Sequence, residues 1–530
     1  MKSKIYIILF LFITCVLNSV NAQKKYWVFF KSKDLTHYVP QEYLSQRTIE
    51  NREARNLPVY DSKDAPVDPA NLSLIESEGA KVLGTTRWLN AALVRANQQK
   101  VEKLDQLDEV SAVSEARRPK VLPAQFEAPD EKDLKPEQQR VLKGQLSSMG
   151  FASFKEHGVS GKNVRIAVFD TGFPNVDEHP AFRHLHEEGR IIATYDFVKD
   201  REEVFGAGMH GQNTLSCIAG RTGDIQIGLA PDAEFLLART ERGQFEYYGE
   251  ELNWMKAMEW ADKHGADIIS SSLGYTYHRY FKQNMDGKTS LVAKAAKIAF
   301  EKGMLVVNSA GNDGSSDWEV VGTPADVEEV LSVGGVNPGT TLHTSFSSYG
   351  PTVDMRRKPD VAAYGYAIVA FGSSNYMKAA GTSFSAPLVA GFAACVMQMH
   401  PEWDNRKVKE EIMKAGNLYP YYDYVHGYGI PQAEYFTGEN EPREASFKFV
   451  ETTDSLYVEV SNPEILENKG KALTGDYLYY HFENDMNFLD RYLVVRANKA
   501  FQIGFLKSEY TGKLLRVHYR GYTNEYEFSK

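Results

Sequence analysis

The segment AAGTSFSAPLVAGFAACVMQM, residues 379–399, decides the fold of this chain. It predicts a helix that is apolar on nearly every face, and such a helix must be central and buried. Ser383 lies in the first turn, where the helix dipole and free backbone N–H groups favour negative charge. Gly381 allows the backbone to approach a ligand closely. A serine at the start of a buried helix is a candidate nucleophile.

Short apolar strands alternate with helices around this segment, over about residues 145–437. Buried parallel strands joined by helices predict an open α/β sheet, in which ligands bind at the carboxyl ends of the strands. The predicted strands are 164–169, 235–238, 267–270, 304–308 and 330–333, and the predicted helices are 252–264 and 290–302.

Two further segments supply partners for the serine. VRIAVFDTG (164–172) ends a buried strand at Asp170, and MHGQNTLSCIAG (209–220) begins a small-residue helix at His210. A serine hydroxyl is a poor nucleophile unless a base takes its proton, and that base needs a carboxylate to hold its tautomer. Asp170, His210 and Ser383 can form such a set.

A third segment, LVVNSAGNDG (305–314), places Asn312 in a glycine-flanked loop after a strand. Acyl transfer needs hydrogen-bond donors aimed at the oxyanion that develops on the substrate carbonyl. The side-chain amide of Asn312 and the backbone N–H of Ser383 can supply them.

The segments FDTG, HGQNTLSCIAG, SSLG, NSAGNDG, FSSYGPTVDMRRKPDVAA and GTSFSAP resemble those of the subtilase family of serine proteases, in the family's order. The resemblance implies a subtilisin-like doubly wound parallel sheet over residues 141–437. It implies that Asp170 orients, His210 acts as base, Ser383 is the nucleophile and Asn312 lies in the oxyanion hole. It also implies that two backbone segments bind an extended substrate and form the wall of the P1 pocket: Ser272, Leu273 and Gly274, and Ser309, Ala310 and Gly311.

One motif departs from the family. Subtilases usually read HGTH at the catalytic histidine, whereas this chain has Gln212 and Asn213 after His210-Gly211. The departure leaves an alternative open: a catalytically weak protein-binding protein on a subtilase scaffold.

The remaining sequence divides into four regions. Residues 1–22 have a basic start, a thirteen-residue apolar stretch and small residues at their end, which predicts a cleaved signal peptide and a secreted or cell-envelope protein. Residues 23–121 predict a small α+β domain, which by the resemblance is an inhibitory propeptide that assists folding. The polar, proline-containing linker 122–140 is the predicted region of maturation cleavage. Residues 441–530 predict a C-terminal β-sandwich whose role is open.

Composition restricts the function classes. The 530 residues include 60 Lys and Arg and 70 Asp and Glu, a net charge of −10, with no long basic run that would predict nucleic-acid binding. A mean hydropathy of −0.41 excludes a multi-span membrane protein, and no membrane span is expected after signal removal. Cys217 and Cys395 are expected as buried thiols. We expect a monomer that acts on protein or peptide substrates and requires no cofactor.

Several other patterns are weaker. FDTG alone would suit an aspartic protease, but that site needs a second such carboxylate, and no second DTG or DSG occurs. The histidines at 179, 184 and 186 do not have zinc-ligand spacing and are expected in a solvated loop. Calcium stays possible but unassigned, so no metal ligand is predicted. Asp313, beside Asn312, predicts a preference for a basic P1 residue, with an exposed loop acid of little effect as the alternative.

Overall fold

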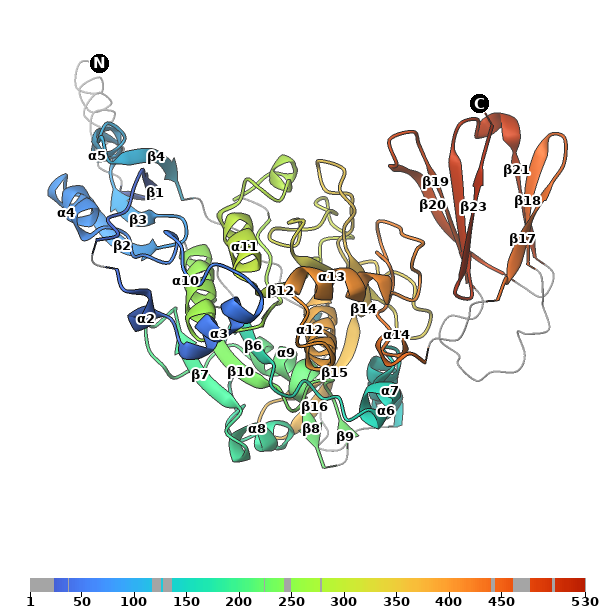
Figure 1. Cartoon of the computed structure of the whole chain (residues 1–530), viewed down its shortest axis with the longest axis horizontal. Helices are drawn as coiled ribbons and strands as arrows, with labels where there is room; N and C mark the ends of the chain where they lie inside the picture. Colours follow the sequence, from blue (N-terminus) through green and yellow to red (C-terminus); the bar gives the residue numbers. More distant parts are fainter. Residues whose placement is uncertain are drawn as a thin grey trace, which may run out of the picture.

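The computed structural model describes residues 23–36, 38–116, 125–126, 136–223, 225–242, 249–276, 279–439, 444–460, 477–497 and 501–529. Three bodies follow one another along the chain: an N-terminal α+β domain, a central α/β domain and a C-terminal β-domain (Figure 1). This is the order of domain classes that the sequence predicts. The predicted signal peptide lies outside the described residues.

The N-terminal domain is built on an antiparallel sheet in the order β2-β3-β1-β4. Two short helices, Pro40–Tyr43 and Gln46–Ala54, follow β1. They are separate because Leu44 leaves the helical backbone and Ser45 caps the second helix by accepting the N–H of Thr48. The helix at 69–77 was not predicted. The elements are β1 (Lys24–Phe30), α2 (Pro40–Tyr43), α3 (Gln46–Ala54), α4 (Pro69–Ser77), β2 (Lys81–Thr86), β3 (Ala91–Ala96), α5 (Gln98–Leu104) and β4 (Val110–Glu115).

The central domain contains a seven-stranded sheet in which all neighbouring strands are parallel, in the order β14-β13-β12-β11-β6-β10-β7. Strand β6 is the first strand of this sheet along the chain. Strands β10 and β7 lie on one side of it, and strands β11 to β14 follow on the other side. The winding direction therefore reverses next to β6, where ligands bind in such sheets. The strands are β6 (Arg165–Asp170), β7 (Ile191–Asp196), β10 (Glu234–Arg239), β11 (Ile268–Ser271), β12 (Leu305–Ser309), β13 (Leu331–Val336) and β14 (Val361–Tyr364). The two edge strands, β7 and β14, were not predicted.

Helices and short strands surround this sheet. The helices are α6 (Pro136–Ser147), α7 (Phe151–Glu156), η1 (Pro180–Phe182), α8 (Arg183–Glu187), α9 (His210–Ala219), α10 (Glu250–Lys263), η2 (Lys282–Asn284), α11 (Leu291–Glu301), α12 (Thr382–Met399), α13 (Asn405–Lys414) and α14 (Glu434–Thr437). The short strands are β8 (Arg221–Thr222) with β9 (Ile225–Gln226), and β15 (Tyr366–Phe371) with β16 (Asn375–Ala380) and β5 (Gln125–Phe126). Helix α6 starts within the predicted 122–140 linker.

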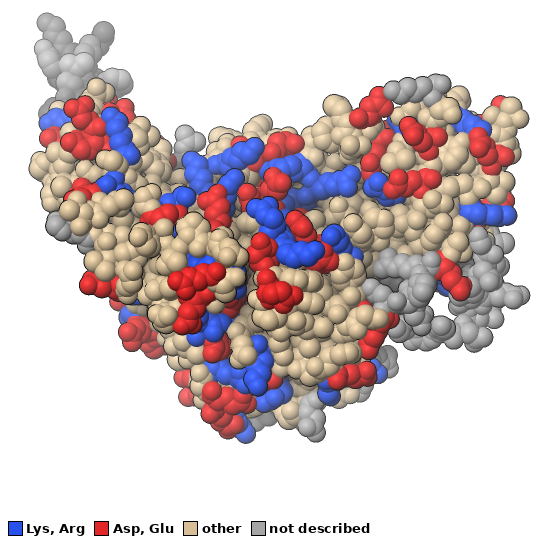
Figure 2. Space-filling view, in the orientation of Figure 1, with Lys and Arg blue, Asp and Glu red and all other residues tan. Residues whose placement is uncertain are grey.

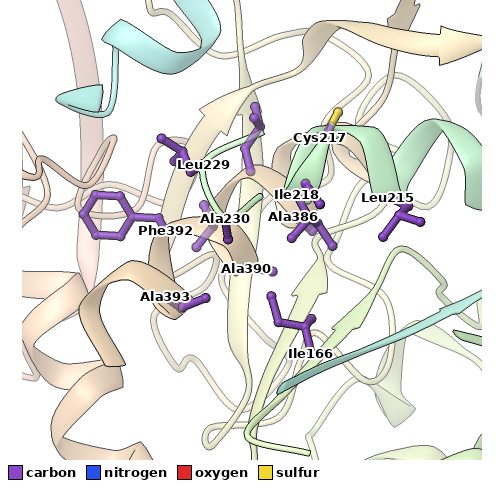
Figure 3. Close-up of a cluster of buried hydrophobic side chains, with 14 of the residues drawn as sticks. Ile166, Leu215, Cys217, Ile218, Leu229, Ala230, Ala386, Ala390, Phe392 and Ala393 are labelled. Atoms are coloured by element: carbon purple, nitrogen blue, oxygen red, sulfur yellow. The ribbon is translucent and has the colours of Figure 1, made fainter. Parts of the chain in front are cut away.

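Helix α12 is the buried helix that the sequence predicts. Figure 3 shows Ala386 and Ala390 of α12 beside Ile218 of α9, with Ile166 of the sheet below them. Small side chains on α12 let the two helices approach closely, so the start of each helix is held by a packed core. Among the described residues α12 alone is long and apolar enough to cross a membrane, but 89% of that stretch is buried inside the protein.

The N-terminal domain covers helices α10 and α11. Trp27 and Trp88 share a hydrophobic cluster with Leu252 of α10. The carboxylate of Glu259, also in α10, accepts the hydroxyl hydrogen of Thr86 at 2.6 Å and the backbone N–H of Trp88 at 3.1 Å. The contact between the two domains is therefore both apolar and hydrogen-bonded.

A buried charged cluster of four residues, Arg52, Asp64, Asp262 and Lys302, forms a second contact between these domains. Arg52 of α3 donates to both carboxylate oxygens of Asp262 at 2.7 and 2.8 Å and to Asp64 at 3.1 Å. Lys302, which follows α11, donates to Asp64 at 2.7 Å. Burial alone would raise the pKa of Asp64, but the charges of Lys302 and Arg52 outweigh burial and lower it. Each charge in this cluster thus has a partner from the other domain.

The C-terminal domain is a sandwich of two antiparallel sheets, β17-β18-β21 and β20-β19-β22-β23, as the sequence predicts. Phe447 and Leu456 of one sheet and Leu478 and Val517 of the other share one hydrophobic core. The elements are β17 (Phe447–Glu451), β18 (Ser455–Val460), β19 (Tyr477–Glu483), β20 (Leu489–Arg496), β21 (Gln502–Leu506), η4 (Lys507–Glu509), β22 (Leu514–Tyr519) and β23 (Tyr522–Glu527). Figure 2 shows Lys and Arg interspersed with Asp and Glu on the visible face of the three domains.

Candidate active site

Three segments that carry predicted site residues leave the same edge of the central sheet. β6 ends at Asp170, β11 ends one residue before Ser272, and β12 ends three residues before Asn312. The three strands are parallel neighbours, in the order β12-β11-β6. Their carboxyl ends therefore lie side by side, at the reversal of the sheet where a ligand site is expected.

Asp170 holds His210 in one orientation. Nδ1 of His210 lies 2.8 and 3.0 Å from the two carboxylate oxygens of Asp170, which is completely buried. The carboxylate also accepts the backbone N–H of Thr171 at 2.7 Å and the hydroxyl hydrogen of Thr214 at 3.0 Å. Because an ionised carboxylate only accepts, Nδ1 of His210 carries the hydrogen, and Nε2 is left with a lone pair that can take a proton.

Gly211 permits this contact. A Cβ atom at residue 211 would lie 2.2 Å from the carbonyl oxygen of Gly172 and 3.0 Å from Cβ of Asp170. A side chain there would push the first turn of α9 away from the end of β6. The glycine after His210 is therefore required for the close approach of the imidazole to Asp170.

Ser383 occupies the second position of α12, directly beside the end of β11. Gly381, just before the helix, has a φ of +149°. Pro387 lacks an N–H and so cannot bond to the carbonyl oxygen of Ser383 four residues earlier. The hydroxyl of Ser272 donates to that oxygen instead, at 2.8 Å, and Oγ of Ser383 lies 3.5 Å from the carbonyl oxygen of Ser272.

His210 and Ser383 approach each other through their helices. The ring of His210 lies 5.8 Å, centroid to centroid, from the ring of Phe384, the residue that follows Ser383. Ser383 is 5% exposed and the side chain of His210 is 13% exposed. The structure thus brings Asp170, His210 and Ser383 into one largely buried group.

Thr382 determines which way the amide of Asn312 points. Oδ1 of Asn312 accepts the backbone N–H of Thr382 at 2.9 Å and lies 3.0 Å from the Thr382 hydroxyl. A backbone N–H can only donate, so the atom that faces it must be the amide oxygen. The NH₂ group of Asn312 therefore points away from Thr382, where it can serve as a hydrogen-bond donor. Sequence reasoning missed Thr382.

The two predicted substrate-binding segments lie next to each other because β11 and β12 are neighbours. Buried Asn308 joins them, since its Nδ2 donates to the carbonyl oxygens of Leu273 at 3.0 Å and Ser309 at 2.9 Å. Beside Gly274 the space is open: the atom nearest to a Cβ built there is 4.0 Å away. Residues 272–274 and 309–311 thus follow neighbouring parallel strands, and their role as walls of a substrate site stays a prediction.

Gln212 and Asn213, where this chain departs from the family, are both completely buried. Nε2 of Gln212 donates to the carbonyl oxygen of Gly372 and Nδ2 of Asn213 donates to that of Ala370, each at 2.6 Å. These bonds attach α9 to β15 and its turn. The departure coexists with an intact contact between Asp170 and His210.

The structure also bears on the expectations for the histidines at 179, 184 and 186, for Asp313 and for the two cysteines. His179 and His184 are buried, so the expectation of a solvated loop is wrong for these two residues, whereas His186 is exposed. The N–H of Ala181 donates to Nδ1 of His179, and Nε2 of His179 therefore donates to the carbonyl oxygen of Asn375. Asp313 is 6% exposed, so it is not an exposed loop acid, and its influence on P1 preference stays a prediction. Cys217 and Cys395 are buried free thiols, as expected, and burial raises the pKa of both.

Within the described ranges, no group of three or more His, Cys, Asp or Glu is arranged to hold a metal ion. Calcium remains unassigned. The chemistry of the site is that of hydroxyl, imidazole, carboxylate and amide groups.

Comparison with known proteins gives two family matches. Residues 161–429, just over half of the chain, match the sequence model of the Subtilase family. Residues 25–132 match the Peptidase S8 propeptide domain of Bacteroidota. The second match covers the N-terminal domain and part of the predicted linker.

Individual relatives agree with these matches. Serine protease AprX of Bacillus subtilis (strain 168) is 29% identical over 308 residues, which are 52% of this chain and 66% of AprX, slightly less than two thirds. Subtilisin NAT of Bacillus subtilis subsp. natto is 27% identical over 347 residues, 64% of this chain and 78% of that protein. The crystal structure of the epidermin leader peptide processing serine protease of Staphylococcus aureus has a TM-score of 0.56 at 16% identity, and the match covers 80% of this chain and 100% of that chain. The chain belongs to the subtilase family of serine-type endopeptidases, with an N-terminal propeptide domain.

Proposed function

We propose that this chain is the zymogen of an exported serine endopeptidase, which hydrolyses proteins or peptides through Asp170, His210 and Ser383. The observation that carries the proposal is the contact of His210 with buried Asp170, at 2.8 Å, on the helix that packs against the helix of Ser383. The remaining groups of an acyl-transfer site lie around this pair.

Acylation follows from these positions. Oγ of Ser383 attacks the carbonyl carbon of the scissile bond while Nε2 of His210 takes its proton, and Asp170 stabilises the imidazolium. The NH₂ group of Asn312 and the backbone N–H of Ser383 stabilise the oxyanion, because both lie at the positively polarised start of α12. His210 then gives the proton to the leaving amine, and the C–N bond breaks.

Deacylation repeats these steps with water. His210 removes a proton from water, the hydroxide attacks the ester carbonyl, and the proton returns to Oγ of Ser383. No cofactor enters either step. The walls beside Gly274 and Gly311 would bind the substrate backbone as an extended strand, and the product leaves as a carboxylate.

The propeptide acts as an intramolecular inhibitor in this proposal. Its sheet is held on α10 and α11 by an apolar cluster and by the buried charged cluster of Arg52, Asp64, Asp262 and Lys302. Such contacts hold the domain on the enzyme after a single peptide bond is cut, so that release becomes a separate step. We further propose secretion, or retention in the cell envelope, as a monomer.

The alternative of a weak binding protein rested on Gln212 and Asn213. Their hydrogen bonds to the β15 region give both residues a structural role that leaves His210 in place. This favours the enzyme.

Hydrolysis of a fluorogenic protein substrate tests the proposal. We would compare residues 23–530 with Ser383→Ala, Asp170→Asn and, as a matched control, Ser385→Ala. Ser385 lies in the same turn of α12, where its hydroxyl donates to the carbonyl oxygen of Tyr364 at 3.1 Å, outside the proposed machinery.

The proposal expects hydrolysis by the native chain and by Ser385→Ala, and loss of about 10⁴-fold or more of kcat with Ser383→Ala or Asp170→Asn. Equal hydrolysis by the native and Ser383→Ala chains would contradict it. If the native chain is inactive, limited trypsin treatment that removes the propeptide should release activity; continued inactivity after removal would also contradict it.

A further inference from the structure

A second aspartate–histidine pair, Asp423 with His426, lies between α13 and α14. Nδ1 of His426 lies 2.9 and 3.1 Å from the two carboxylate oxygens of Asp423, and the side chains are 3% and 0% exposed. The backbone N–H of His343 donates to Nε2 of His426 at 2.9 Å. Since a backbone N–H can only donate, Nε2 accepts, and Nδ1 carries the hydrogen that Asp423 receives. The pair thus fixes one tautomer of His426 and directs its accepting nitrogen to residue 343.

The bond at His343 holds the start of a turn, residues 343–348. Nε2 of His343 lies 2.8 Å from the carbonyl oxygen of Ser347, and because that oxygen can only accept, the ring donates to it. The hydroxyl of Ser347 accepts the N–H of Gly335 in β13 at 2.9 Å. The N–H of Thr344 donates to the carbonyl oxygen of Gly335 at 3.0 Å. The turn 343–348 is therefore attached both to His426 and to the central sheet.

The same turn supports the loop of Asn312 on both sides of that residue. The N–H of Ser348 donates to the carbonyl oxygen of Gly311 at 2.9 Å, and the hydroxyl of Ser348 accepts the N–H of Asp313 at 3.0 Å. A Cβ atom at residue 311 would lie 2.8 Å from Oγ of Ser348, so the two segments are in close contact. A shift of the turn 343–348 would therefore move the loop that carries Asn312.

The C-terminal domain covers the second pair. The ring of Tyr479 in β19 lies 5.5 Å, centroid to centroid, from the ring of His426. Tyr479 also shares a hydrophobic cluster with Leu418 and Tyr421, which belong to the same segment as Asp423. Figure 1 shows β19 on the side of this domain that faces the central domain. Because this cover excludes water, the loss of one hydrogen bond of the pair would leave a buried group without a partner.

We propose that His426 is a positioning residue for the reaction: through the turn 343–348 it holds Asn312 where the NH₂ group meets the oxyanion. This inference rests on the proposed function, in which Asn312 is an oxyanion donor. His426 acts through Asn312 and not on the substrate. The inference also gives the C-terminal domain a part in catalysis, because Tyr479 shields the Asp423–His426 pair from water.

Steady-state hydrolysis by the trypsin-activated chain tests this role. His426→Phe keeps a ring of similar size but removes the donor to Asp423 and the acceptor for the N–H of His343. His426→Gln keeps an amide oxygen that can accept that N–H. The matched control is Tyr424→Phe, which removes from the same domain contact the hydroxyl that accepts the N–H of Leu489 at 3.4 Å.

The inference expects His426→Phe to lower kcat about tenfold and to change KM less than about twofold, because it removes a buried hydrogen bond that positions a transition-state donor. It expects His426→Gln to recover most of this loss, and Tyr424→Phe to match the native chain. An unchanged kcat in His426→Phe, no recovery in His426→Gln, or an equal loss in Tyr424→Phe would overturn it.

A double-mutant cycle separates positioning from a purely structural role. If His426 acts through Asn312, His426→Phe should lower kcat less than about twofold further in an Asn312→Ala background. An equal factor in both backgrounds would overturn the inference. If His426→Phe does not fold, Ser348→Ala takes its place in the cycle, because it removes the hydroxyl that accepts the N–H of Asp313. The same loss and the same non-additivity are expected, and an additive loss would overturn the inference.

Labelling with a fluorophosphonate separates this inference from the proposed function. A native chain that labels at Ser383 and hydrolyses the substrate, with His426→Phe and Ser348→Ala equally active, overturns the inference and leaves the protease function standing. A native chain that neither labels nor hydrolyses after trypsin treatment contradicts both.

Discussion

Replacing Asp262 with Asn should weaken the hold of the propeptide on the enzyme. In the zymogen both carboxylate oxygens of Asp262 accept hydrogen bonds from Arg52, and the two side chains are 3% and 2% exposed. Asparagine preserves the shape but removes the charge and one acceptor. Because Asp262 belongs to α10 of the enzyme, the fold of the propeptide itself is unchanged.

The expected rise in the inhibition constant of the propeptide follows from the hydrogen bonds that the Asp262→Asn change weakens. A hydrogen bond to a charged group contributes about 1.5–3 kcal/mol when it is buried. At about 1.4 kcal/mol for each tenfold change, the inhibition constant of the propeptide should rise about 10- to 100-fold. Arg52 keeps its second partner, Asp64, at 3.1 Å, so the loss should stay below that of a completely unpaired buried charge.

Inhibition of the mature enzyme by added propeptide, residues 23–121, measures this change. Glu301→Gln is the matched control, because Glu301 forms an exposed ion pair with Lys63 across the same contact, at 3.7 Å with side chains 47% and 41% exposed. Exposed pairs contribute little, so the control should change the inhibition constant by less than about fivefold. Equal inhibition of the Asp262→Asn and native enzymes, or an equal loss in both variants, would refute the reasoning.

Three further changes test other parts of the account. Asn312→Ala should lower kcat about 10²- to 10³-fold with little change in KM, because an oxyanion donor acts mainly in the transition state; steady-state kinetics check this, and an unchanged kcat contradicts it. Ser272→Ala, in a Ser383→Ala background that prevents autolysis, should lower the free energy of unfolding in urea by about 1–3 kcal/mol, because the carbonyl oxygen of residue 383 loses its donor. Burial, aided by the nearby charge of His426, lowers the pKa of His343 from 6.5 to about 4, which favours the neutral ring in the fold. The stability of the fold should therefore be highest above about pH 6.5 and should fall by on the order of 3 kcal/mol as the pH drops toward 4, because the buried ring must then take up a proton. In the same Ser383→Ala background, the thermal unfolding of His343→Phe should depend less on pH. An unchanged pH dependence would contradict this.

The sequence predicts the central sheet and the groups on its carboxyl edge well, because both depend on local pattern. Asp170 ends an apolar strand and Ser383 starts an apolar helix, and either feature is visible in about ten residues. The edge strand β7 was missed because its apolar character is weak: residues 191–195 are at least partly exposed. The other edge strand, β14, is buried throughout and could have been predicted from its apolar run. The start of α4 could have been predicted, since Asp68 and Pro69 form a typical helix start.

The positioning residues could not be predicted in the same way. Arg52 has the sequence context of a solvent-exposed helix residue, and only the contact with Asp262, 210 residues away, buries it. Thr382 acts through a loop 70 residues earlier in the chain, at Asn312. One signal was available: Pro387 follows Ser383 by four residues and so predicts a free carbonyl oxygen at Ser383, although not that Ser272 supplies its donor.

The central claim is that Ser383 is the nucleophile and that His210 and Asp170 activate it. Mapping a fluorophosphonate adduct by peptide mass spectrometry on the trypsin-activated chain tests this claim most directly. The account predicts a stoichiometric adduct on Ser383, its loss in Asp170→Asn, and its retention in Ser385→Ala. An adduct on another residue, or no adduct on an activated and folded chain, would contradict it.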